Sequence, residues 1–206
     1  MVSVSLAKGG NISLSKAVPG LTKVMVGLGW DVRETDGPPY DLDASALACG
    51  PDKKVLSDDH FVFYGSSLTT EEPAPEDRRP RSPDWSIICG PDNRTGEGDG
   101  DDEFIDVDLA GVSPDVTNIV IVVSIHEADN LKQSFGQVSN AYIRVVDSVT
   151  DVELARYDLA EDASTETAIV FGELYRREAE WKFRAIGDGF ASGLAGIVRS
   201  YGVDVG

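Results

Sequence analysis

The sequence predicts a mainly β protein: an antiparallel β-sandwich of about ten strands with one short helix and a C-terminal helix. Short apolar stretches recur along the chain, clusters of Gly, Pro, Asn or Asp bound each of them, and few helical patterns lie between. At 206 residues the chain is long enough for one sizeable core. We therefore expect a single domain over residues 1–206.

The expected strands show either alternating or continuous apolar character. In residues 24–30 every second residue is apolar, which places those side chains on one face. Ile119–Ile125 is apolar on both faces, as a central strand would be. The expected strands, in order, are Val2–Leu6, Val24–Trp30, Leu42–Cys49, Phe61–Tyr64, Phe104–Leu109, Ile119–Ile125, Ala141–Val146, Glu153–Tyr157, Ala168–Leu174 and Trp181–Ala185.

Two segments show helical character and one is loop-like. Glu127–Ser134 suits a short helix that ends at Gly136, and apolar residues at helical spacing from Asp188 onward predict a helix packed on the sandwich. The proline-rich segment 68–83, LTTEEPAPEDRRPRSP, predicts an exposed, mobile loop within the domain.

The charge of the chain limits its partners. A net charge of -18 disfavours binding to nucleic acid or to anionic lipid, and favours a cation or a basic protein partner. The N-terminus lacks the pattern of a secretory signal, and the longest apolar run is too short to span a bilayer. We expect a cytoplasmic protein without direct membrane insertion.

The segment from Asp92 to Asp108, DNRTGEGDGDDEFIDVD, holds eight carboxylates against one arginine. Because such close anions repel one another, the folded chain must either leave the segment solvated or neutralise it with a cation. Carboxylates on a glycine-rich turn suit calcium, which takes roughly six to eight oxygen ligands. An EF-hand is excluded, because a frame starting at Asp99 puts Phe104 where that motif needs glycine.

A calcium site needs ligands from more than one loop, because adjacent residues cannot surround an ion. Asp41 and Asp43 are two residues apart and would face the same side of a strand. Asp31, together with Asp92 or Asn93, would complete the coordination shells. The acidic segment adds Asp99, Asp101, Asp102 and Glu103, which gives enough carboxylates for two calcium ions. The alternative is a solvated acidic turn that binds nothing specific.

Catalytic chemistry has less support in the sequence. His60 and His126 are isolated, and no nucleophile-elbow motif offers a serine partner. Cys49 and Cys89 lack the spacing of a zinc or redox motif, and an acidic chain is a poor setting for a reactive thiol. We therefore expect no enzymatic activity.

Motifs along nearly the whole chain carry a resemblance to a known family. They are SVSLAKGGNISLSK, VGLGWD, YDLDAS, DNRTGEGDGDDE, FGQVSNAYIRV, ELARYDL with EDASTETAIVFGELYR, and WKFRAIGDGFASGLAGI. Together they resemble the TerD family of tellurite-resistance and stress-response proteins. Segment 68–83 looks longer than the family pattern, which bears on any shared surface function near it and not on the metal ligands.

The resemblance implies a calcium-binding β-sandwich with its ions at the DLD and acidic segments. The matching ligand positions are Asp31, Asp41, Asp43, Asp92, Asn93, Asp99, Asp101, Asp102 and Glu103, with Glu161 and Asp162 as a further acidic pair. It also implies a role in tellurite and stress resistance as a scaffold for protein partners in a membrane-associated complex. Two alternatives stay open: a calcium-bridged binder of an anionic small molecule or lipid headgroup, and an enzyme with structural calcium.

Overall fold

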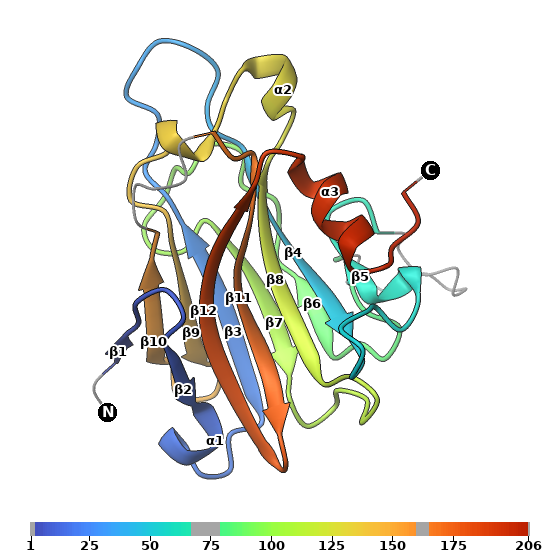
Figure 1. Cartoon of the computed structure of the whole chain (residues 1–206). Coiled ribbons are helices and arrows are strands. Elements are labelled where there is room, and N and C mark those ends of the chain that lie inside the picture. The colour runs from blue at the N-terminus through green and yellow to red at the C-terminus, as the bar shows by residue number, and fades with distance from the viewer. Residues whose placement is uncertain (1–2, 67–78, 160–164, 206) are drawn as a thin grey trace.

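The computed structural model describes residues 3–66, 79–159 and 165–205. Within these residues, twelve strands form two six-stranded sheets that pack face to face (Figure 1). The pairings between these strands are antiparallel except for the parallel pair β1 and β10. The antiparallel sandwich predicted from the sequence is confirmed.

The two sheets draw strands from all parts of the chain. Sheet A runs β1 (Val4–Ser5), β10 (Val152–Asp158), β9 (Tyr142–Asp147), β3 (Lys23–Gly29), β7 (Glu103–Asp108) and β6 (Ile87–Cys89). Sheet B runs β2 (Asn11–Ser13), β12 (Glu180–Phe190), β11 (Ala168–Arg177), β8 (Asn118–Ile125), β4 (Leu42–Cys49) and β5 (Phe61–Val62). The helices are α1 (Leu14–Ala17), α2 (Ala128–Leu131) and α3 (Gly193–Ser200), with 3-10 turns at Asp58–His60 and Phe135–Gln137.

Alternation along the strands separates two apolar clusters. Ile119 and Ile121 of β8 belong to the main core between the sheets. Val120 and Val122, which point the other way, pack in a second cluster that includes Ile197 of α3. Strand β8 is thus buried on both faces and lies between β11 and β4, as its continuous apolar run predicts. Helix α3 covers the outer face of sheet B (Figure 1).

The structure corrects several element boundaries. The edge strands β2 and β6 are absent from the prediction because three residues are too few to show alternation. The C-terminal helix begins at Gly193 and not at Asp188, because residues 188–190 continue β12 and pair with β11. A register shift in β11 between Val170 and Gly172 accompanies this extension. The predicted helix stop is confirmed, with Gly202 in the left-handed conformation.

The second predicted helix is also shorter than expected. Helix α2 ends at Leu131, because Lys132 adopts the left-handed conformation, and a 3-10 turn follows. Most of the predicted loop 68–83 lies outside the described residues, while Arg81, near its end, forms a β-bridge with Ile88 of β6. Every helix in the described parts of the chain is too short or too polar to cross a bilayer.

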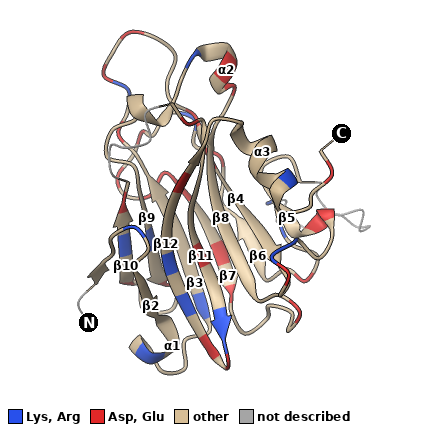
Figure 2. Ribbon diagram, in the orientation of Figure 1, with Lys and Arg blue, Asp and Glu red and all other residues tan. Residues whose placement is uncertain are grey.

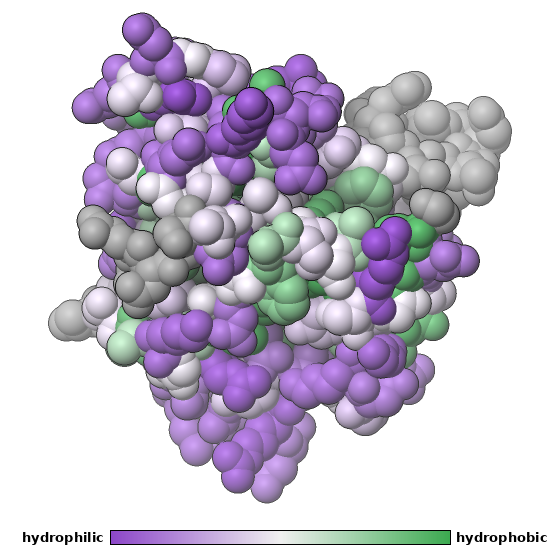
Figure 3. Space-filling view, turned by 45° about the horizontal axis from the view of Figure 1, so that its top comes forward, coloured by the Kyte–Doolittle hydropathy of each residue, from purple (hydrophilic) through white to green (hydrophobic). Residues whose placement is uncertain are grey.

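One end of the sandwich collects the segments singled out by the sequence. Residue Leu28, near the end of β3, pairs with Glu103 at the start of β7, and Leu42 at the start of β4 pairs with Ile125 at the end of β8. Acidic residues are spread over many elements and loops (Figure 2). Hydrophilic residues cover much of this loop end when it is turned forward, with apolar residues exposed in smaller areas (Figure 3).

Candidate metal site

Three carboxylates from two segments meet at this end of the sandwich. Asp41 directly precedes β4, Asp43 is the second residue of β4, and Asp92 lies in the loop between β6 and β7. One oxygen from each can be chosen so that all lie within 4.8 Å of one another. Calcium–oxygen bonds are about 2.3–2.6 Å long, so oxygens on one ion lie at most about 5 Å apart. The three oxygens are therefore spaced closely enough to share one ion.

The electrostatics of this carboxylate cluster (Asp41, Asp43 and Asp92) also suit a cation. The Asp41 Oδ1 atom is buried and has no hydrogen-bond partner among the described residues. Asp43 is only 7% exposed, and its burial, followed by the charge of Asp41, raises its pKa to about 7. At Asp43, burial and the charge of Asp41 together outweigh the opposing effect of the nearby His126, so the ionised form stays disfavoured. A bound cation would stabilise that form.

Glu103 stands beside the cluster and links the two sheets. Its Oε2 accepts a hydrogen bond of 2.6 Å from the backbone N–H of Ala44 on β4, and its Oε1 accepts one of 3.4 Å from Asn93. Burial raises the pKa of Glu103 to about 8. Glu103 and the cluster residues Asp43 and Asp92 line a common hollow of about 450 Å³, here called the loop-side hollow.

Trp30 fixes the relative position of the two acidic segments. Its indole N–H donates to the carbonyl of Tyr40, directly before Asp41, and its backbone N–H donates to Asp102. Gly96 lies over the indole, so closely that a Cβ atom there would clash with the ring. The tryptophan of the VGLGWD motif thus contacts both the DLD segment and the acidic loop.

Asn93 and Asp102 organise the acidic loop itself. The side-chain carbonyl of Asn93 accepts hydrogen bonds from the backbone N–H groups of Thr95 and Gly96, at 3.1 and 3.2 Å, and so forms an Asx turn. Its amide donates to Asp102 Oδ1 at 3.2 Å. The side chains of Asn93 and Asp102 therefore stabilise the conformation of the acidic loop.

Asp101 faces the outside of sheet A and is neutralised there. Both of its oxygens accept from the Arg144 Nε, at 2.8 and 3.0 Å, and Oδ1 also accepts from the hydroxyl of Tyr142. The carboxylate lies against Gly27 of β3, where any Cβ atom would overlap with it. Asp101 therefore anchors the end of the acidic loop to the sheet.

The remaining predicted ligands lie apart from the cluster or outside the described residues. Asp31 accepts a hydrogen bond of 2.5 Å from the side-chain amide of Asn140. Asp99 is exposed on the turn between Gly98 and Gly100. Glu161 and Asp162 lie outside the described ranges. The structure therefore brings Asp41, Asp43, Asp92 and Glu103 together, and the full ligand set stays a prediction.

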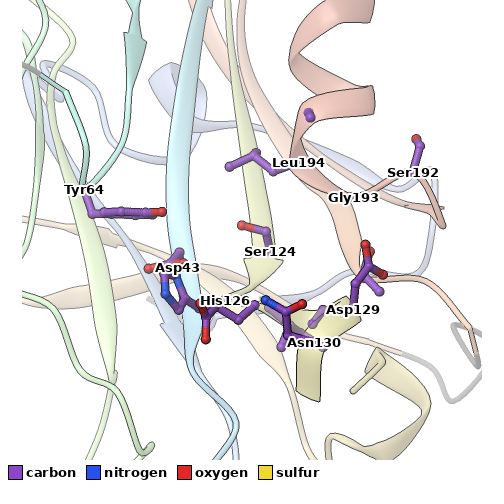
Figure 4. Close-up of a pocket in the computed structure, with 14 residues that line it drawn as sticks. Asp43, Tyr64, Ser124, His126, Asp129, Asn130, Ser192, Gly193 and Leu194 are labelled. Carbon is purple, nitrogen blue, oxygen red and sulfur yellow. Dashed lines mark ion pairs between the residues drawn. The ribbon is translucent and has the colours of Figure 1, made fainter. Parts of the chain in front are cut away.

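Sequence reasoning missed two neighbours of the cluster. His126 Nδ1 lies 3.6 Å from Asp43 Oδ2, and the ring of Tyr64 packs edge-on against the histidine. These side chains line a second hollow of about 450 Å³ between β4, β8, α2 and the start of α3, where Figure 4 shows Asp43, His126 and Tyr64 side by side. Only the β4–β8 pairing, which a single sequence does not reveal, would have found His126.

The two cysteines are buried. Burial raises the pKa of both Cys49 and Cys89 to about 12, and both are free. Thiols with such pKa values stay protonated at neutral pH.

The fold and the cluster define the class of protein: an acidic antiparallel β-sandwich with a carboxylate cluster where its two sheets meet an acidic loop. A model of the TerD domain matches residues 2–201. The chain therefore belongs to the TerD family, and the resemblance drawn from its motifs is confirmed.

Named relatives are similar over their full lengths. The chain is 53% identical to the tellurium resistance protein TerD of Serratia marcescens, covering 98% of this chain and 99% of the relative. It is 45% identical to general stress protein 16U of Bacillus subtilis (strain 168), covering 100% of both chains. The crystal structure of a TerD homologue from Streptomyces coelicolor A3(2) superposes with a TM-score of 0.60 at 28% identity, covering 87% of this chain and 96% of that one.

Proposed function

We propose that this chain is a non-enzymatic calcium-binding protein of the tellurite-resistance and stress-response type, acting inside the cell as a calcium-dependent scaffold for protein partners. The observation that carries the proposal is the meeting of Asp41, Asp43 and Asp92, with an unpartnered buried oxygen on Asp41. The names of the TerD relatives support the biological role.

Calcium is the cation that this donor set fits best. The three oxygens that meet are all from carboxylates, which suits a hard divalent ion, whereas zinc sites are built mainly from imidazole and thiolate ligands. Asp41, Asp43 and Asp92 would hold the ion, with Glu103 next to it. A second ion, as predicted from the sequence, would need further carboxylates.

The ion would supply charge neutralisation and a cross-link. Asp92 belongs to the acidic loop, whereas Asp41 and Asp43 belong to the entry of β4, so a shared ion would tie the loop to sheet B. Without it, Glu103 and Trp30 still connect the two segments through the hydrogen bonds described above. Calcium would thereby order the surface around the loop-side hollow, where we propose that partners dock.

One observation favours a second candidate, a calcium-bridged binder of an anionic ligand. The loop-side hollow is lined by Arg79 and Arg94 as well as by the cluster. An anion there would meet both arginines and the ion. A ligand oxygen would then complete the calcium coordination.

A growth assay tests the proposed role. In a bacterial host that lacks its own TerD-family protein, the wild-type chain is expected to raise tellurite tolerance, whereas the D41A/D43A variant is expected to lose that effect. The D36A/D59A variant removes two exposed acids outside the cluster and is the charge-matched control. Full tolerance with D41A/D43A, at equal protein level, would exclude a role for the cluster in resistance.

A further inference from the structure

Arg94 is the one basic residue of the acidic segment 92–108. Its Nε donates a hydrogen bond of 2.8 Å to Asp92 Oδ2, so its guanidinium forms an ion pair with one carboxylate of the cluster. Arg94 also lines the loop-side hollow together with Asp43 and Glu103. The cluster thus has a counter-ion built into the same loop that supplies one of its ligands.

The exposure of this pair makes it replaceable. The Arg94 side chain is 75% exposed and that of Asp92 is 39% exposed. Solvent-exposed ion pairs contribute little to stability, because water screens the attraction and holding long side chains costs entropy. Arg94 can therefore exchange Asp92 for water at small cost. A buried pair, by contrast, would block the site.

We propose that Arg94 is an internal competitor of calcium for Asp92 and sets the calcium affinity of the cluster. This inference rests on the proposed calcium function. In the metal-free protein the guanidinium partly neutralises the three carboxylates. A dication on the same carboxylates repels the guanidinium, so calcium binding displaces Arg94 from Asp92. Calcium then binds only when its free concentration is high enough to displace Arg94 from Asp92.

Displacement also changes the surface beside the site. Once released from Asp92, Arg94 remains tethered to the acidic loop at the rim of the loop-side hollow. The position of the Arg94 guanidinium on this surface therefore depends on whether calcium is bound. A partner with an acidic group can form an ion pair with Arg94 in that position.

Calcium titration calorimetry of R94Q, R94K and wild-type protein tests the proposal. R94Q is expected to bind calcium roughly three- to ten-fold more tightly, because both the competition and the charge repulsion are removed. R94K keeps the charge but lacks Nε, so its affinity should lie between the two. R199Q removes a charge from the last turn of α3 and should leave the affinity unchanged.

Thermal unfolding gives an independent readout. In EGTA, R94Q is expected to melt below the wild type, since its carboxylates lose their counter-ion, and with saturating calcium the difference should vanish or reverse. Equal or weaker calcium affinity of R94Q would overturn the role of Arg94 while leaving the calcium site intact. No calcium binding by the wild type would overturn both the inference and the function on which it rests.

Discussion

Replacing Asp41 and Asp43 together by alanine is expected to abolish the stabilisation that calcium gives to the wild-type protein. The two side chains supply two of the three carboxylates that meet at the cluster. At a free concentration of 100 times its dissociation constant, one bound ion adds about 2.7 kcal/mol to the free energy of unfolding. The variant should lose this whole amount, because Asp92 alone cannot surround an ion.

In the absence of calcium the same variant should be at least as stable as the wild type. Asp43 is almost fully buried and lies beside Asp41, and both burial and this neighbour disfavour its ionised form. Removing the two carboxylates therefore relieves desolvation and repulsion at neutral pH. The double substitution is thus expected to separate a loss of metal binding from a loss of folding.

Urea unfolding in EGTA and in calcium measures both effects. The D36A/D59A variant, which carries the same net charge as D41A/D43A, should keep the full calcium response. An undiminished calcium response in D41A/D43A would place the ion elsewhere on the protein.

Replacing Gly27 by alanine is expected to destabilise the fold by about 2 kcal/mol, in the range found for overpacking. A Cβ atom at this position would lie well inside 3.0 Å of the Asp101 carboxylate, closer than real Cβ contacts. The clash forces Asp101 away from Arg144 and Tyr142. It thereby loosens the end of the acidic loop, so calcium stabilisation should fall as well.

A double-mutant cycle isolates this clash. In the D101A background the obstructing carboxylate is gone, and Gly27→Ala should be neutral or slightly stabilising, since alanine costs less backbone entropy than glycine. The two substitutions should therefore show a coupling free energy of about 2 kcal/mol. Additive effects in urea unfolding would show that Asp101 is not the group that requires glycine.

The strands that the sequence predicted well are those whose side chains face a core on at least one side. Strand β3 alternates and β8 carries apolar residues on both faces, and both were predicted to within one residue of their observed ends. The short edge strands carry no such signal. The start of α3 was misplaced because the last residues of β12, 188–190, also fit the helical spacing of the residues that follow them. These residues form a strand because they pair with β11.

The sequence predicted that the DLD segment and the acidic loop meet, as Asp41, Asp43 and Asp92 do, while the metal-ligand set stays a prediction. The i, i+2 spacing of Asp41 and Asp43 correctly places them on one side of the chain. The chain bends at Asp102 and the strand begins only at Glu103, so strand alternation does not extend over these residues and Asp101, Asp102 and Glu103 meet different partners. Those partners are more than forty residues away in the sequence, where composition and spacing give no signal.

Thermal unfolding of the wild-type protein in EGTA, in calcium and in magnesium tests the central claim most directly. With calcium at about 100 times its dissociation constant we expect the melting temperature to rise by about 5–11 °C, and magnesium should give a much smaller rise. No shift with either ion would contradict the account. The cluster would then be a set of carboxylates that the fold holds together without a metal.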